Sequence, residues 1–210
     1  MITLPMPKNA RQVFIDGPQG VLDCMELQTS IALVGVAIVF HPDPKSGGNN
    51  TNKVVQAIAK SLNNKGYLCI CPNLRGVGES DGSHDMGIGE VDDGLAIVDY
   101  LKANYLSQEI VLAGFSFGTS VAANLASRLG DNDYRKLILL GPAVTRYSVP
   151  ISNVAKTIVI HGGEDEIIEL SAVNEWSCEQ NQPIMVVPSA GHFFHGKLSV
   201  ISQLLSSFII

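Results

Sequence analysis

A serine lies at the point where an apolar segment gives way to a run of small residues. Residues 110–113 are apolar, Gly114-Phe-Ser116-Phe-Gly118 follows directly, and residues 119–123 include threonine, serine and two alanines. Glycine tolerates the close contacts of a sharp strand-to-helix turn, and such a turn presents a serine hydroxyl at the start of a helix. We therefore predict Ser116 as a nucleophile, with an ordinary turn that contains a serine as the alternative.

A second serine has the same glycine spacing in a different setting. Gly78-Glu-Ser80-Asp-Gly82 lies well past the end of its predicted strand, among polar residues, and no helix opens directly after it. Nothing there would hold the serine in a strained turn or place a helix N-terminus beneath it. We expect Ser80 in a surface loop or at the rim of a pocket.

A nucleophilic serine needs a base, and the base needs an acid that orients it. The apolar run of residues 157–160 leads to Asp165, and the run of residues 184–187 leads to His192. Loops that follow the carboxyl ends of parallel strands meet at one edge of a sheet, where such sheets place their sites. The chain order Ser116, Asp165, His192 therefore predicts a nucleophile, its orienting acid and its base.

Other titratable residues close to these loops remain alternatives. Two acidic residues, Glu164 and Glu166, flank the predicted acid, and His195 could replace the predicted base. His195 comes later, at the start of the last predicted helix, and would be set back from the sheet. We expect His161, at a strand end, to be a structural hydrogen-bonding residue, and His84 to be exposed to solvent.

The elements that must position these residues alternate between strand and helix. Apolar runs with β-branched residues indicate strands buried on both faces, and runs at helical spacing lie between them. The predicted strands are 34–40, 67–71, 110–113, 137–140, 157–160 and 184–187, and the predicted helices are 53–65, 90–104, 117–129, 167–178 and 197–208. Residues 12–15 and 21–27, joined by a polar turn, predict an antiparallel hairpin. We expect one α/β domain over residues 1–210, with a mostly parallel sheet of about eight strands and helices on both faces.

Composition excludes several other classes of protein. The chain has 210 residues, 46% of them hydrophobic and 16% charged, with a net charge of -6. The acidic balance argues against nucleic acid as a partner. Residues 31–40, the longest apolar run, are far short of the roughly 20 that a membrane helix needs, and the N-terminus does not resemble a signal peptide. The four cysteines suit free buried thiols, so we expect a cytoplasmic protein that does not bind a membrane, with its oligomeric state left open.

Several further motifs resemble those of a known superfamily. They are His41-Pro-Asp-Pro44, Gly47-Gly48, Asn52-Lys-Val-Val55 and the loop from Asn73 to Gly82. With the Ser116 turn, they are similar to the α/β-hydrolase superfamily over nearly the whole chain. More narrowly, they resemble small cap-less serine hydrolases related to dienelactone hydrolases and S9-type peptidases. Asp43 departs from that pattern, because histidine is usual there.

The resemblance implies two backbone donors for the oxyanion of an acyl-transfer reaction. One is the N–H of Phe117, directly after the nucleophile, and the other comes from the loop after the third strand. Pro42 and Pro44 have no N–H, so Asp43 is the only donor between them. Its carboxylate would repel an oxyanion, and we therefore expect it to turn outward, to pair with a cation such as Lys45 or Arg75, or to select a cationic substrate.

These residues predict a serine hydrolase that acts on small esters or thioesters through an acyl-enzyme on Ser116. No cofactor is required by this chemistry, and no group of residues has the spacing of metal ligands, so we predict neither. Residues 141–156 are too short for a cap, which predicts an open pocket and short acyl groups. A small peptidase, a carbon–carbon bond hydrolase or a non-catalytic binding module on the same scaffold are the alternatives.

Overall fold

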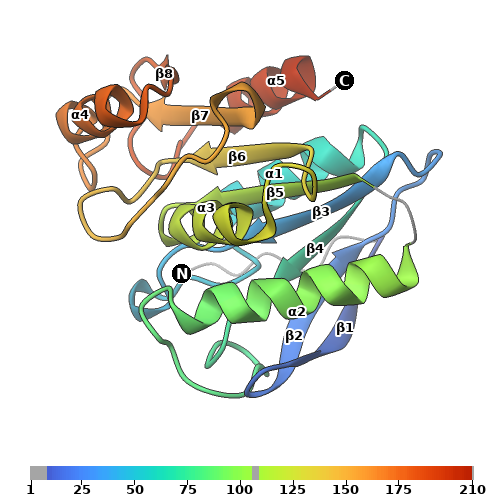
Figure 1. The fold of residues 1–210 in the computed structure, drawn as a ribbon. Helices are drawn as coiled ribbons and strands as arrows, with labels where there is room; N and C mark the ends of the chain where they lie inside the picture. The colour runs from blue at the N-terminus through green and yellow to red at the C-terminus, as the bar shows by residue number, and fades with distance from the viewer. Residues whose placement is uncertain (1–8, 106–108, 210) are drawn as a thin grey trace.

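A computed structural model of the protein describes residues 9–105 and 109–209. Within this part of the chain, eight strands form a single sheet (Figure 1). The strands are β1 (Ala10–Gly17), β2 (Gly20–Leu27), β3 (Gly35–Phe40), β4 (Tyr67–Pro72), β5 (Glu109–Phe115), β6 (Lys136–Leu140), β7 (Thr157–Gly162) and β8 (Ile184–Val187). Their order is β1-β2-β4-β3-β5-β6-β7-β8. β2 runs antiparallel to both of its neighbours, and the strands from β4 to β8 are parallel.

Helices cover both faces of this sheet. They are α1 (Lys53–Asn63), α2 (Gly89–Asn104), α3 (Phe117–Leu129), α4 (Leu170–Gln180) and α5 (Leu198–Phe208), with two 3-10 turns, η1 (Pro44–Ser46) and η2 (Val154–Lys156). Figure 1 shows α2 and α3 in front of the sheet and α1 behind it. The buried side chains form two clusters, one between the sheet and α2, α3 and α4, the other between the sheet and α1 and α5.

The central strands owe their position to uninterrupted apolar sequence. All six residues of β3 and all six of β4 are buried, as expected for parallel strands covered on both faces. β1 is an edge strand with partly exposed residues, and the Phe14 side chain on it is half-exposed. The predicted hairpin is confirmed, with Asp16 opposite Val21 beside the turn.

The predicted strands and helices are found with small shifts, and one boundary differs by three residues. The helix predicted from residue 167 begins at Leu170. The cause lies just before it, where the Asp165 carboxylate accepts the backbone N–H groups of Ile167 and Ile168. An aspartate that bonds the backbone two and three residues ahead stabilises a turn in place of helix.

The connection between β6 and β7 contains no cap. Residues 141–153 form turns and bends, and the 3-10 turn η2 follows directly before β7. The carboxyl ends of β3, β5, β7 and β8 therefore lie uncovered by an inserted domain. Among the helices described here, none has the length and apolar character needed to cross a bilayer.

Candidate active site

Ser116 lies in a tight turn between β5 and α3. Its backbone has φ 53° and ψ -119°, a region that non-glycine residues rarely occupy. The turn is closely packed: a Cβ atom on Gly114 would lie 2.1 Å from the Gly118 carbonyl oxygen, and one on Gly118 would lie 2.4 Å from the Phe40 carbonyl oxygen. Glycine is therefore required at both positions, and the turn holds the Ser116 hydroxyl at the N-terminus of α3.

The predicted base and acid meet this serine in one hydrogen-bonded chain. The distance between Ser116 Oγ and His192 Nε2 is 2.9 Å, and that between His192 Nδ1 and Asp165 Oδ2 is 2.8 Å. All three residues are buried, with Ser116 at 9% exposure the most accessible. A carboxylate can only accept, so Nδ1–H donates to Asp165, and Nε2 is left as the acceptor for the serine hydroxyl.

The Asp165 carboxylate is held in its charged form. Its burial acts to raise its pKa, but the hydrogen bonds from His192 and from the backbone N–H groups of Ile168 and Ile167 outweigh this and lower the pKa below its usual value. Oδ1 accepts the two backbone donors, which leaves Oδ2 for the imidazole. The loop after β7 therefore fixes both the charge and the direction of this carboxylate.

The neighbouring titratable residues do not take part in this chain. Glu164 is exposed, and Glu166 is exposed but accepts the backbone N–H of His192 at 3.4 Å, which steadies the histidine loop. His195 is exposed and stacks on Phe193, with ring centroids 5.9 Å apart. The structure thus brings the His192 ring into hydrogen-bond distance of Ser116, and Asp165 into hydrogen-bond distance of the same ring. None of the alternative side chains bonds either Ser116 or this ring.

His161 is the structural hydrogen-bonding residue that the sequence predicts. Its side chain is fully buried, and Nε2–H donates to the carbonyl oxygen of Ile168 at 2.9 Å. The same nitrogen lies 3.6 Å from Asp165 Oδ2. Burial lowers the pKa of His161, more than the nearby Asp165 charge raises it. A neutral His161 therefore ties the acid-bearing loop to the end of β7.

The second serine with glycine spacing lies in a loop, as predicted, but its side chain is buried and not at the surface. The hydroxyl of Ser80 donates to the Asn73 carbonyl oxygen at 2.7 Å and accepts the Asp23 N–H at 2.8 Å. It fastens the loop after β4 to β2. Both hydrogen-bonding directions of its hydroxyl are used by the backbone.

His84 is also not exposed as predicted. Its side chain is only 12% exposed, with Nδ1 2.7 Å from Glu90 Oε1 and the ring edge-on to Phe117 at 5.2 Å. Glu90 is fully buried and accepts the backbone N–H groups of Asp85 and Gly87, both at 2.8 Å. The loop before α2 is therefore folded back onto a buried carboxylate and packed against the residue that follows the nucleophile.

The Asp43 backbone N–H is free to donate, and the Asp43 carboxylate is hydrogen-bonded within its own loop. No acceptor for the Asp43 N–H exists within the part of the chain that the structure describes. The carboxylate accepts the backbone N–H of Lys45 at 2.8 Å, capping η1. The expected alternative that Asp43 pairs with Arg75 is wrong. The buried Arg75 guanidinium instead donates two hydrogen bonds to Asp93, of 2.9 and 2.7 Å.

His41 belongs to a motif noted in the sequence, but its role is visible only in the structure. It is fully buried, its Nδ1–H donates to the Pro42 carbonyl oxygen at 2.7 Å, and its Nε2 accepts the Leu74 N–H at 3.1 Å. Burial lowers its pKa to about 4, so the ring is neutral. In a planar trans peptide the carbonyl and the next N–H point in opposite directions. By fixing the Pro42 carbonyl, His41 fixes the direction of the Asp43 N–H.

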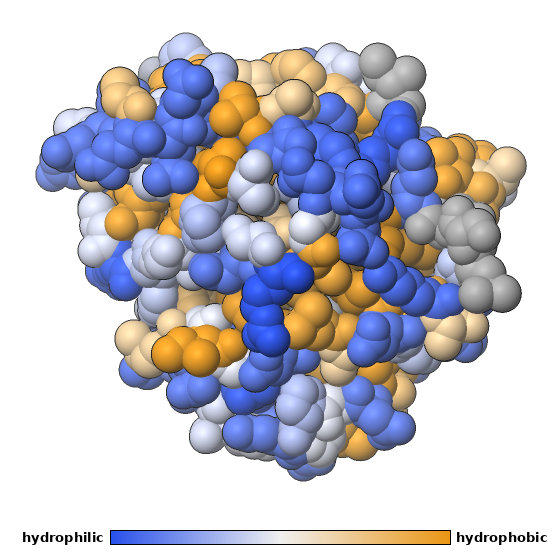
Figure 2. Space-filling model, viewed as in Figure 1, coloured by the Kyte–Doolittle hydropathy of each residue, from blue (hydrophilic) through white to orange (hydrophobic). Residues whose placement is uncertain are grey.

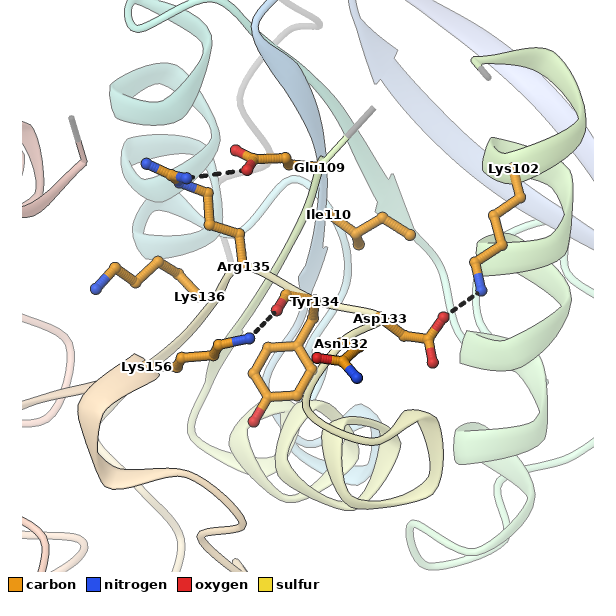
Figure 3. Close-up of a pocket in the computed structure, with 9 residues that line it drawn as sticks. All are labelled: Lys102, Glu109, Ile110, Asn132, Asp133, Tyr134, Arg135, Lys136 and Lys156. Carbon is orange, nitrogen blue, oxygen red and sulfur yellow. Dashed lines mark hydrogen bonds and ion pairs between the residues drawn. The ribbon is translucent and has the colours of Figure 1, made fainter. Parts of the chain in front are cut away.

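A cavity lies away from these residues. It has a volume of about 690 Å³, and most of the residues that line it lie at or just before the amino ends of β5, β6 and β7 (Figure 3). Its charges are largely paired: Lys102 bonds Asp133 at 2.8 Å and Arg135 bonds Glu109 at 2.9 Å. We interpret it as an ion-paired surface hollow. In the described ranges, no three His, Cys, Asp or Glu side chains are grouped so as to hold a metal ion.

Sequence and structure comparisons with known proteins identify the family of this chain. The sequence model of the alpha/beta hydrolase fold family matches residues 44–158. An uncharacterised Rickettsia prowazekii protein is 30% identical over 95% of this chain and 88% of its own length. A lid-less serine hydrolase from Xanthomonas campestris is 34% identical, with a TM-score of 0.88 over 97% of this chain and 95% of that one. A serine hydrolase homologue from Coxiella burnetii is 30% identical, with a TM-score of 0.86 over 95% and 97% of the two chains.

These similarities run through the parts that form the site. The family match includes the Ser116 turn, and the two solved structures cover 97% and 95% of this chain. The missing cap between β6 and β7 agrees with the Xanthomonas protein, which is also without a lid. The chain belongs to the alpha/beta hydrolase family.

Proposed function

We propose that the protein is a serine hydrolase that cleaves small ester or thioester substrates through an acyl-enzyme on Ser116. The observation that carries the proposal is the hydrogen-bonded chain from Ser116 through His192 to Asp165, with distances of 2.9 and 2.8 Å. Nucleophile, base and orienting acid within hydrogen-bond reach of each other are the arrangement that activates a serine. The lid-less serine hydrolase relative from Xanthomonas supports the same activity.

In this mechanism the serine oxygen forms a bond to the substrate carbonyl carbon while His192 Nε2 takes the hydroxyl proton. The tetrahedral intermediate collapses, the bond to the leaving alcohol or thiol breaks, and His192 returns the proton to the leaving group. A water molecule then attacks the acyl-enzyme by the same route and releases the acid. Asp165 stays ionised throughout, in keeping with its lowered pKa, and stabilises the protonated imidazole.

Two backbone donors would stabilise the oxyanion that forms in each half of the reaction. Phe117 supplies one at the N-terminus of α3, and Asp43 supplies the other from the loop after β3. That loop lies against the first turn of α3, because a Cβ on Gly118 would contact the carbonyl oxygens of Phe40 and His41 at 2.4 and 2.8 Å. His41 acts as a positioning residue, since its bond to Pro42 aims the Asp43 N–H.

The shape of the site supports small substrates. No cap rises between β6 and β7 to enclose a long chain. An acyl group would therefore gain little buried surface beyond its first few carbons, apart from any that reach a neighbouring hollow.

The experiment compares wild-type protein with Ser116→Ala on matched p-nitrophenyl esters, thioesters and anilides of one acyl group. We expect hydrolysis of esters and thioesters by wild type, a loss of several orders of magnitude in Ser116→Ala, and little turnover of anilides. Efficient anilide cleavage would favour the peptidase alternative. No turnover of any of these substrates by a folded wild-type protein would contradict the proposal.

A further inference from the structure

A second hollow, which we call the α2–α3 groove, opens next to the proposed nucleophile. Its volume is about 570 Å³, and it lies between the start of α2, the first turns of α3 and the loop after β6. Its lining includes Met86, Ile88, Val91, Ser120, Arg146 and Tyr147. On this face, apolar surface occurs in patches separated by hydrophilic surface (Figure 2).

The groove is joined to the nucleophile through Phe117, the residue directly after Ser116. The Tyr147 ring lies edge-on to the Phe117 ring, with centroids 4.9 Å apart. On the other side, a Cβ on Gly87 would lie 3.4 Å from the same ring and 3.7 Å from Ser120 Oγ. Ser120 is one helical turn beyond Ser116, or about 6 Å along the axis of α3.

The groove also borders the proposed oxyanion loop. Lys45, two residues after Asp43, places its Nζ 3.2 Å from the Met86 sulfur. Tyr147 also lies near Asp43. The pKa of the Tyr147 hydroxyl is raised, mainly by burial and in part by the charge of the Asp43 carboxylate. The α2–α3 groove therefore borders the loop that carries the proposed oxyanion donor, and Ser116 itself is not among the residues that line it.

The apolar wall of the groove is exposed and held in place. Met86 is 51% exposed and Ile88 is 74% exposed, although large apolar side chains normally pack inside a protein. Met86 has a positive φ of 54°, which is strained for methionine. The buried Glu90 holds this strain by accepting the N–H groups on both sides of it, from Asp85 and Gly87. An exposed apolar wall that is rigid before binding is typical of a ligand site.

One cation at the groove has no partner. Within the described ranges, the Arg146 guanidinium makes no ion pair or hydrogen bond. Arg128 on α3 also lines the groove, but it is paired, because it bonds Asp92 at 2.6 Å. An unpaired guanidinium beside an apolar wall fits a ligand that is apolar along its length and carries a carboxylate, which arginine binds through two parallel hydrogen bonds.

We propose that the α2–α3 groove binds the acyl group of the substrate, and that this group is an apolar chain or ring ending in a carboxylate that Arg146 binds. The inference rests on the proposed hydrolase function and names the substrate class of that same site. The natural substrate would then be a monoester or monothioester of a dicarboxylic acid.

The test compares p-nitrophenyl hydrogen adipate with p-nitrophenyl hexanoate, which has the same number of acyl carbons and no terminal carboxylate. For wild type we expect a higher kcat/KM on the adipate ester. Arg146→Gln should lower the adipate-to-hexanoate ratio about tenfold, which corresponds to about 1.4 kcal/mol. Lys60→Gln, which removes one positive charge from the exposed side of α1 on the other face of the sheet, is the control and should leave the ratio unchanged. An unchanged ratio in Arg146→Gln, or a wild-type preference for hexanoate, would overturn the inference while leaving the hydrolase function standing.

A binding measurement separates this inference from catalysis. Ser116→Ala protein would be titrated with the adipate ester by calorimetry, with and without Arg146→Gln. We expect an approximately tenfold weaker Kd in the double variant. Equal affinities would overturn the inference whatever the turnover, whereas failure of the hydrolase proposal alone would abolish turnover and leave this difference in affinity in place.

Discussion

The neutral state of His41 predicts a specific loss of stability in acid. The imidazole has an ordinary pKa of 6.5, and burial lowers the pKa of His41 in the folded protein to about 4. Between these values the unfolded chain binds a proton that the folded protein does not bind, so the free energy of unfolding falls as the pH falls. The contribution is present above pH 6.5 and is lost as the pH falls through about 4.

The size of this loss follows from the two pKa values. At about 1.4 kcal/mol for each pH unit, the contribution of His41 falls by about 2 kcal/mol between pH 7 and pH 5, and by about 3 kcal/mol at pH 4. His41→Asn removes the titrating group while its amide can still donate to the Pro42 carbonyl oxygen. The variant should be less stable at pH 7, because the Leu74 N–H loses its acceptor, but its stability should change less with pH.

Urea unfolding measures both quantities, with the fluorescence of Trp176 as the signal. This is the only tryptophan of the chain, and it is buried on α4. The free energy of unfolding of wild type should fall by about 2 kcal/mol more than that of His41→Asn between pH 7 and pH 5. Equal changes in the two proteins would show that His41 is protonated as easily in the folded state as in the unfolded state, and would refute its place as a fixed neutral donor behind the oxyanion loop.

Three further predictions concern the reaction itself. Asp43→Pro should lower kcat on the order of 10²–10³ because one oxyanion donor is lost, whereas Asp43→Asn keeps the N–H and should stay within about tenfold on neutral esters; near-normal activity of a folded Asp43→Pro protein would place the donor elsewhere. Asp165→Asn should keep the fold, measured by circular dichroism, but lose most activity on p-nitrophenyl esters, because the imidazole of His192 loses the carboxylate that orients it; near-normal activity of a folded Asp165→Asn protein would argue against Asp165 as the orienting acid. Acetate and butyrate esters should be turned over faster than emulsified dodecanoate or longer esters, without activation at the interface, and the opposite order would contradict an open, cap-less site.

The hydrogen-bonded chain of Ser116, His192 and Asp165 could be predicted because each of these residues follows a separate strand. Ser116, Asp165 and His192 lie in loops after β5, β7 and β8, and parallel strands bring their carboxyl ends to the same edge of a sheet. The two glycines around the serine carry further information, since the structure leaves no room for a side chain at either. Apolar runs long enough to be buried on both faces located the strands themselves.

The supporting residues could not be predicted because their partners are distant backbone groups. His41 accepts from an amide 33 positions away, and Ser80 bonds Asp23 57 positions away, so no local spacing reports either contact. His84 lies in a loop rich in polar residues and glycine, which suggests exposure. Its burial depends on Phe117, which packs against it from another part of the chain. Tertiary packing, and not local pattern, decided these positions.

Covalent labelling with a fluorophosphonate probe tests the central claim most directly. The probe reacts with a serine only when that serine is activated by a base, and intact-mass and peptide analysis identify the modified residue. We predict a single adduct on the peptide that contains Ser116, no adduct in Ser116→Ala, and normal labelling of Ser80→Ala. Labelling that persists in Ser116→Ala, or that is lost in a folded Ser80→Ala protein, would contradict the assignment of Ser116 as the nucleophile.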